Sequence, residues 1–150
     1  MLSTGDFYSS FLETKNKKIM NTLIRTLPSA TGLAHQHVFE LLPEALANIP
    51  FHENTDAISR FVAKGFPVHL AIHEISPLHE APGQYTFPHV HEDYDEVNII
   101  LSNKLLLYQI QVGADDYTLR NNACIFIPRG IEHAANVLRG SGYFITIRIN

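Results

Sequence analysis

The sequence predicts an all-β sandwich or barrel preceded by a helical stretch, and three observations lead to this expectation. The chain has 150 residues, 45% hydrophobic and 17% charged, which suffices for one buried core without disulfides. Apolar residues recur at helical spacing before Pro28. After Gly65, short apolar segments alternate with turn residues, a pattern typical of β-sandwiches and barrels.

The N-terminal stretch is expected to form an amphipathic helix. Between Asp6 and Leu27 the apolar residues share one face, and lysine and glutamate side chains occupy the opposite face. Pro28 ends the helix, because proline lacks the N–H that would continue the hydrogen-bonding pattern. We expect this helix to pack on its own domain rather than on a membrane surface.

A second, shorter helix is expected over residues 38–49. Residues 51–64 fit either a turn or two of helix or a first strand. The chain is therefore divided into a helical extension, residues 1–64, packed on the outside of a β-barrel of residues 65–150.

The β-region divides at its glycine, proline and asparagine clusters. The expected strands cover residues 68–75, 84–91, 96–102, 105–112, 117–119, 123–127, 133–138 and 143–149. In the third of these, Val97, Ile99 and Leu101 share a wholly apolar face. We expect this face to be covered by the N-terminal helices or by a second subunit.

Composition excludes several classes of function. The net charge is −4 at pH 7, and no lysine or arginine cluster is interleaved with aromatic residues, so nucleic acid is not an expected partner. No apolar run approaches the roughly 20 residues that cross a bilayer. Cys124 is the single cysteine and reads as a buried core residue; it cannot form an internal disulfide. Without a signal-peptide pattern either, the sequence predicts a cytoplasmic protein.

Three histidines and a carboxylate point to a metal site. His89 and His91 alternate along an extended segment, so their side chains project to one face. The polar residues 92–95 read as a hairpin loop that returns Glu96 beside them. His133 follows the turn after a buried strand and can enter the same pocket.

This set of ligands suits one divalent transition metal ion. Imidazole and carboxylate together favour iron, manganese, nickel, cobalt or zinc. Four protein ligands leave roughly two positions open on a six-coordinate ion, where substrate, water or dioxygen can bind.

The order of these residues resembles the cupin superfamily. Its first motif is matched by Gly83, His89, His91 and Glu96, with Asn103 where the final glycine belongs. In the second motif Pro128, Gly130 and His133 match and Asn122 replaces the first glycine; the last position is Val137, with Asn136 one place early. Asparagine tolerates positive φ, so we expect both turns to survive its replacement of glycine. The resemblance covers about residues 65–149.

The resemblance implies a double-stranded β-helix, or jelly-roll, and a small-molecule substrate or ligand. It also implies a homodimer, since small cupins commonly pair through a sheet. The implied function is a metal-dependent enzyme, with Fe(II) dioxygenase-type chemistry preferred because the open positions suit substrate and dioxygen. An isomerase or lyase, and a non-catalytic cupin that binds a sugar or organic acid, stay open as alternatives. Glu96 is a candidate base as well as a ligand.

Further polar residues are candidates for substrate binding. They are the following: Tyr85, Asn98, Gln109, Tyr143 and Arg148. His69 and His73 share a strand face. Either could lie beside the metal ligands, but a partly exposed position is the expectation.

Overall fold

The computed structural model describes residues 37–150 of the chain. The helix expected over residues 6–27, and its packing on the barrel, lie outside these residues and stay predictions. Within the described part, residues Phe39–Asn150 form one compact unit. No helix in that part is long and apolar enough to cross a membrane.

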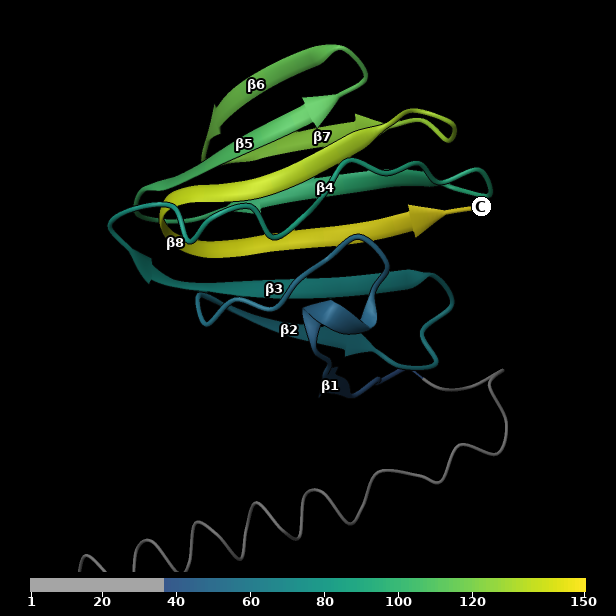
Figure 1. The fold of residues 1–150 in the computed structure, drawn as a ribbon. Helices are drawn as coiled ribbons and strands as arrows, with labels where there is room; N and C mark the ends of the chain where they lie inside the picture. The colour runs from purple at the N-terminus through teal and green to yellow at the C-terminus, as the bar shows by residue number, and fades with distance from the viewer. Residues whose placement is uncertain (1–36) are drawn as a thin grey trace, which may run out of the picture. The chain divides into compact units, whose positions relative to one another are not determined.

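The described residues are mainly β-structure (Figure 1). In chain order the elements are β1 (Leu41–Pro43), the 3-10 helix η2 (Leu46–Asn48), β2 (Ile58–Ala63), β3 (His69–Leu78), β4 (Asp95–Leu101), β5 (Leu106–Val112), β6 (Asp115–Arg120), β7 (Ala123–Ile127) and β8 (His133–Ile149). Antiparallel pairing gives the order β1-β2-β3-β8-β4-β7, and β8 also pairs with β5, which pairs with β6. This arrangement is the jelly-roll that the sequence predicts.

The long strand β8 joins the two parts of the sheet. Its first half pairs with β5, and its second half runs between β3 and β4. The change of partner falls at Gly140 and Gly142, whose φ angles are 101° and 150°. A Cβ atom at Gly140 would lie 1.9 Å from the backbone oxygen of Leu105. The expected strands 133–138 and 143–149 are therefore one bent strand, and glycine is required at the bend.

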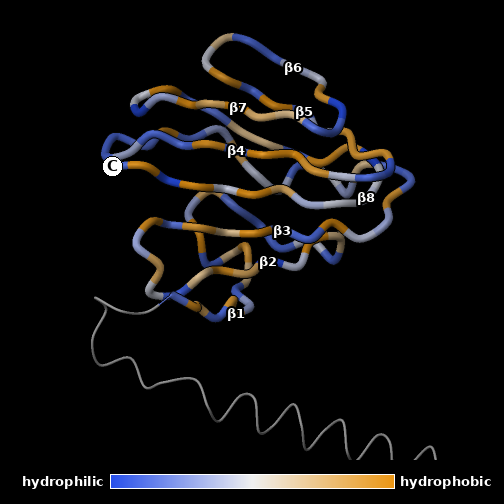
Figure 2. Tube along the Cα trace, turned by 180° about the vertical axis from the view of Figure 1, so that it is seen from behind, coloured by the Kyte–Doolittle hydropathy of each residue, from blue (hydrophilic) through white to orange (hydrophobic). Residues whose placement is uncertain are grey.

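The core lies between the inward faces of these strands. Its largest fully buried side chains are Tyr108, Ile100, Leu106, Ile110 and Val137. They come from β4, β5 and β8, where buried and more exposed residues alternate along much of each strand. Figure 2 shows hydrophobic stretches along these strands in orange. This alternation turns one side of each strand inward.

The helix expected over residues 38–49 is wrong. Pro43 and Pro50 interrupt a helical hydrogen-bond ladder, and the chain instead forms β1 and the single turn η2. Residues Leu41–Pro43 pair with β2, which pairs with β3. The sheet therefore begins before residue 65, so the expected division at residues 64 and 65 falls too late.

The strand expected over residues 84–91 is an extended segment outside any ladder of paired strands. Pro88 cannot donate a backbone hydrogen bond there. The segment is held instead by Asn136, whose Oδ1 accepts from the backbone N–H groups of Tyr85 at 2.9 Å and Thr86 at 3.0 Å. Its Nδ2 also donates to Thr86 O at 2.9 Å. Asn136 thereby fixes the histidine segment against β8.

The outer face of the sheet is apolar but only partly covered by the described residues. Val97 and Ile99 are half-buried, and Leu101 is exposed. Cys124 and Phe126 also face outward, the latter 58% exposed, so the expectation of a wholly buried strand over residues 123–127 is wrong. Strand alternation turns only every second residue inward. A cover supplied by the N-terminal helices or a second subunit stays a prediction.

Candidate metal centre

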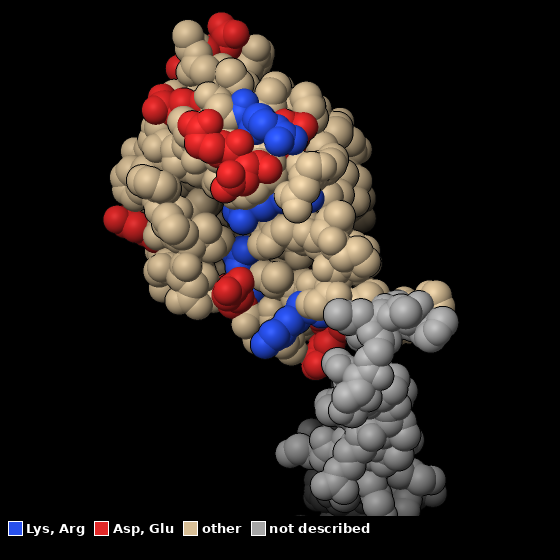
Figure 3. Space-filling model, turned by 90° about the vertical axis from the view of Figure 1, so that its right-hand side faces the viewer, with Lys and Arg blue, Asp and Glu red and all other residues tan. Residues whose placement is uncertain are grey.

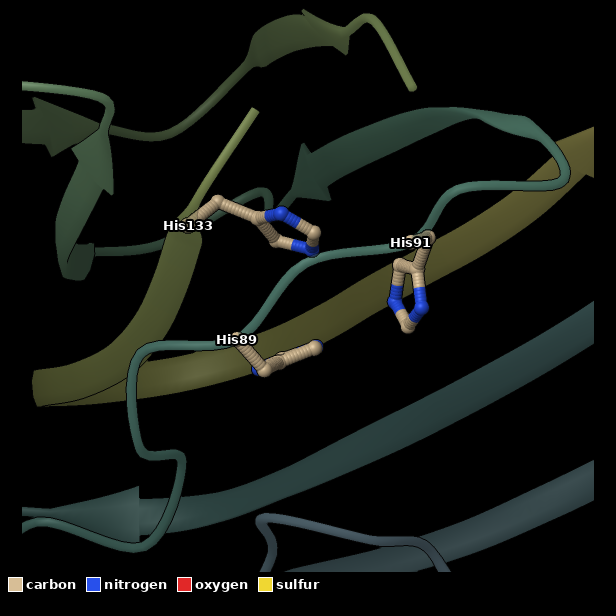
Figure 4. Close-up of side chains that lie close together, drawn as sticks. All are labelled: His89, His91 and His133. Carbon is tan, nitrogen blue, oxygen red and sulfur yellow. The ribbon is translucent and has the colours of Figure 1, made fainter. Parts of the chain in front are cut away.

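Three histidines converge at one end of the jelly-roll (Figure 4). The candidate ligand atoms of His89, His91 and His133 all lie within 4.8 Å of one another. His89 and His91 come from the extended segment before β4, and His133 is the first residue of β8. The backbones of His89 and His133 exchange two hydrogen bonds, 3.1 and 2.9 Å long, which fix the distance between the two chain segments.

The histidine rings are oriented by hydrogen bonds on their Nδ1 atoms. The Nδ1 of His89 lies 2.7 Å from Phe87 O, and the Nδ1 of His133 lies 3.0 Å from Ile131 O. Because a carbonyl oxygen only accepts, both Nδ1 atoms carry the proton and both Nε2 atoms keep a free lone pair. Such a partner is typical of metal-binding histidines, since it fixes the tautomer and the ring orientation.

The third ring has a different partner on the same nitrogen. The Tyr94 hydroxyl lies 2.6 Å from His91 Nδ1. This contact leaves His91 Nε2 for the centre of the cluster. All three rings can therefore offer Nε2 to one ion.

The environment keeps the imidazoles of His89 and His91 neutral. Burial lowers the pKa of His89, and burial followed by the charge of Arg148 lowers the pKa of His91 to about 3. Metal ions bind neutral imidazole. Near neutral pH, His89 and His91 are therefore in the form that a metal requires.

Glu96 faces the same point from β4. Its two carboxylate oxygens each lie 3.7 Å from an imidazole nitrogen, Oε2 from His91 Nε2 and Oε1 from His133 Nε2. Both of these nitrogens are buried and have no hydrogen-bond partner among the described residues. Buried polar atoms are normally paired, so the gap between these atoms suits an ion bound by nitrogen and oxygen.

Strand pairing positions the side chains behind Glu96. Glu96 lies opposite Arg148, and Asn98 lies opposite Thr146, across β4 and β8. Asn98 Nδ2 donates to Glu96 Oε1 at 3.0 Å, and Thr146 Oγ1 donates to Asn98 Oδ1 at 2.9 Å. These bonds orient the carboxylate toward the histidines.

Arg148 joins this arrangement from the other side. Its Nε lies 3.5 Å from Glu96 Oε2, and its guanidinium carbon lies 4.7 Å from the centre of the Tyr94 ring. Tyr94 in turn contacts His91. Arg148 therefore contacts the carboxylate of Glu96 directly and is connected to His91 through Tyr94.

The cluster opens into a small cavity of about 40 Å³. Its lining comes from the inward faces of β2, β3, β4 and β8 and from the histidine segment. On the face drawn in Figure 3, basic side chains lie recessed, with acidic side chains above and below them. Most residues that line the cavity have polar or titratable side chains, and His89 and His133 are among them.

The structure brings three of the five predicted substrate-binding residues to this cavity, namely Tyr85, Asn98 and Arg148. The Tyr85 hydroxyl accepts from Val137 N–H at 2.9 Å. Burial raises the pKa of Tyr85 to about 12. Tyr85 therefore serves the packing of β8 rather than proton transfer.

The other two predictions do not fit the structure. Tyr143 lies opposite Glu74 and Leu101 on the outer face and is 44% exposed. Gln109 is exposed, because its neighbours Tyr108 and Ile110 take the inward positions of β5. In both cases the alternation of the strand turns the side chain away from the cavity.

His69 and His73 line the cavity, which was the alternative to partial exposure, and His52 and Arg60 also line it without having been predicted from the sequence. Arg60 stands between Ile58 and Val62 at the inward positions of β2, so an arginine on an otherwise apolar strand face was the available signal. The expectation that His73 is partly exposed is wrong, since its exposure is 7%. Burial, followed by the charge of Arg60, lowers the pKa of His73 to about 3.

The asparagines at the two glycine positions of the motifs, Asn103 and Asn122, do not adopt the positive φ that we expect of them. Phe51, with φ of 65°, is the one non-glycine residue with positive φ in the described part of the chain. Asn122 instead uses its Oδ1 to accept from Ser102 N–H at 3.0 Å. The turn survives through a side-chain hydrogen bond, a common use of asparagine in turns.

Comparison with known proteins supports the fold alone. No protein-family model and no curated protein matches the sequence. A variant of PAC13 from Streptomyces, solved with uridine, is similar with a TM-score of 0.50 and 8% identity, over 77% of this chain and 84% of that chain. An RmlC-like cupin from Shewanella frigidimarina has a TM-score of 0.47 and 14% identity, over 81% and 91%. KdgF from Halomonas has a TM-score of 0.49 and 13% identity, over 69% and 89%.

The fold and the two sequence motifs agree. The motifs are separate in the chain, yet the jelly-roll brings His89, His91 and Glu96 of the first motif beside His133 of the second. The bent strand β8 carries the second motif's histidine at one end and supplies the partner of β4 at the other. The chain has a jelly-roll fold that brings the residues of both motifs to one place.

Proposed function

We propose that this protein is a mononuclear metal-dependent enzyme that acts on a small organic molecule, with His89, His91, Glu96 and His133 as ligands. One observation carries this proposal. The Nε2 atoms of His91 and His133 are buried without hydrogen-bond partners, and each lies 3.7 Å from a carboxylate oxygen of Glu96. An ion between them would satisfy both nitrogens, which otherwise cost free energy in the folded state.

The preferred reaction class is Fe(II) dioxygenase-type oxidation. A divalent ion supplies Lewis-acid activation of a substrate oxygen, and iron adds redox chemistry with dioxygen. Three imidazoles and one carboxylate leave roughly two positions for substrate and dioxygen. The polar cavity lies directly beside the proposed ligands, where such a substrate would bind.

The residues behind the ligands support precise positioning. Asn98 and Arg148 both contact the carboxylate of Glu96, at 3.0 and 3.5 Å. These partners favour Glu96 as a fixed ligand over Glu96 as a base, because a base would have to leave them. The homodimer and the cytoplasmic location remain proposals from the sequence.

Metal content tests the site. We expect protein purified without added metal to contain close to one transition ion per chain by elemental analysis. The His91→Ala variant should lose the ion and keep the β-sheet circular dichroism spectrum. His79→Ala is the matched control, since His79 is exposed and away from the cavity. A folded wild type that binds no metal even after reconstitution would disprove the site.

Oxygen consumption then tests the reaction class. Iron-loaded protein should consume dioxygen with at least one member of a panel of enols, flavonoids, thiols and small carboxylic acids, whereas His91→Ala should not. If iron-loaded wild type is inactive across the panel, the metal-dependent isomerase or lyase and the non-catalytic binder become the better readings.

A further inference from the structure

Basic side chains outside the proposed ligand set gather on one inward face of the sheet. Across β2 and β3, Arg60 lies opposite His73; across β3 and β8, His69 lies opposite Arg148. Residues directly opposite in antiparallel strands share a face of the sheet. All four line the cavity beside the metal centre.

Three of these four side chains, Arg60, His69 and Arg148, carry a buried nitrogen without a hydrogen-bond partner among the described residues. The Nε of Arg148 lies 3.5 Å from the Glu96 carboxylate, so Arg60 and His69 are the two considered for a ligand. Arg60 is only 5% exposed, and one of its terminal nitrogens pairs with Glu44. Arg60 Nε and His69 Nε2 are both buried, with no hydrogen-bond partner in the part of the chain that the structure describes. A buried polar atom without a partner costs free energy in the folded state, so these atoms are expected to be satisfied by a ligand.

The charges in the cavity set the sign of that ligand. The negative charge of Glu96 offsets the positive charge of Arg148. The charge of Arg60 is offset by Glu44, whose side chain is partly exposed. Burial lowers the pKa of His69 and His73, so both imidazoles are neutral near pH 7. A bound divalent ion would therefore add positive charge that no further charged residue of the cavity lining balances.

We propose that the cavity binds a small organic anion, with its carboxylate held between Arg60 Nε and His69 Nε2. This inference rests on the proposed function for the metal's part in binding, and it makes the substrate of that reaction a small carboxylic acid. A cavity that holds one water molecule has a volume of roughly 10–15 Å³. The cavity of about 40 Å³ therefore has room for a group of carboxylate size.

Calorimetric titration with malonate tests the proposal, with malonamide as its uncharged counterpart. We expect Zn(II)-loaded wild type to bind malonate at least roughly tenfold more tightly than malonamide, because charge-assisted hydrogen bonds are about twice as strong as neutral ones. Arg60→Gln should weaken malonate binding by roughly tenfold or more. Its zinc content should match that of wild type.

Two further variants control this experiment. Arg139→Gln removes the same charge from an exposed position on β8 and should leave malonate binding unchanged. His69→Ala should also weaken malonate binding, and it does not touch the ion pair with Glu44, so it tests the subsite even if Arg60→Gln does not fold. The proposal is overturned if folded Arg60→Gln and His69→Ala both bind malonate like wild type, or if malonamide binds as tightly as malonate.

Titration of metal-free protein separates this inference from the proposed function. Metal-free wild type should still bind malonate more tightly than metal-free His69→Ala, with a lower affinity than the zinc form. Wild type that binds no metal but retains this difference would defeat the metal centre alone. A wild type that binds zinc and shows no such difference would defeat the anion subsite alone.

Discussion

At the scale of single residues, the side chains around the proposed ligands make defined hydrogen bonds that orient those ligands. Asn98 is buried, donates to Glu96 and accepts from Thr146. It thereby links Thr146 to the carboxylate of Glu96. Its role is to orient Glu96, and this role can be measured apart from catalysis.

We expect Asn98→Ala to weaken metal binding by roughly 10–100-fold, the usual effect of removing a residue that orients a ligand. Competition against a chromogenic chelator measures this affinity directly. Asn103→Ala serves as the control, because Asn103 is exposed. Equal metal affinities for wild type and Asn98→Ala would show that Glu96 needs no such support.

The same scale explains which site residues the sequence could predict. His89, His91, Glu96 and His133 belong to two local patterns whose spacing can be read directly. Arg60 belongs to no pattern, because only its register opposite His73 brings it to the cavity. Pairing between strands distant in sequence is set by the whole sheet, and a single sequence does not reveal it.

At the scale of elements, two predictions for substrate-binding residues failed because the sequence does not show which face of a strand a residue occupies. The expected strands 143–149 and 105–112 exist, yet Tyr143 and Gln109 fall on their outward positions. An aromatic or amide side chain suits either side of a strand, so its identity does not fix the face. The glycines at the bend in β8 likewise predict a break between two strands, since glycines mark turns and bulges alike.

The bend gives a prediction about stability. Gly140→Ala should destabilise the protein by on the order of 3 kcal/mol or more, because its Cβ would overlap the Leu105 backbone, in addition to the cost of positive φ. Gly65 also has a positive φ, 77°, but no atom lies within 4 Å of an added Cβ. Gly65→Ala should therefore lower the free energy of unfolding by only about 1 kcal/mol. Urea unfolding measures both values. Similar losses for the two variants would show that the close approach at the bend relaxes cheaply.

At the scale of the whole molecule, the polar cavity makes the folded state sensitive to acid. A buried imidazole that stays neutral in the folded protein takes up a proton on unfolding once the pH falls below its ordinary value. His73 is the clearest case away from the proposed ligands, since burial lowers its pKa from 6.5 to about 3. The unfolded state therefore binds more protons between these two values, and stability falls as the pH falls through this window.

We expect His73 to account for a loss of about 2 kcal/mol in the free energy of unfolding of metal-free protein between pH 7 and pH 5. A His73→Gln variant should lose correspondingly less stability over the same interval, even if it is less stable at pH 7. His79→Gln, at an exposed position, should follow the wild-type pH dependence. Urea unfolding of the chelator-treated proteins at both pH values gives the comparison. Parallel pH dependence of His73→Gln and wild type would mean that water or a neighbouring group supports the charged imidazole in the fold, and the acid sensitivity would then have to come from the histidines of the metal centre.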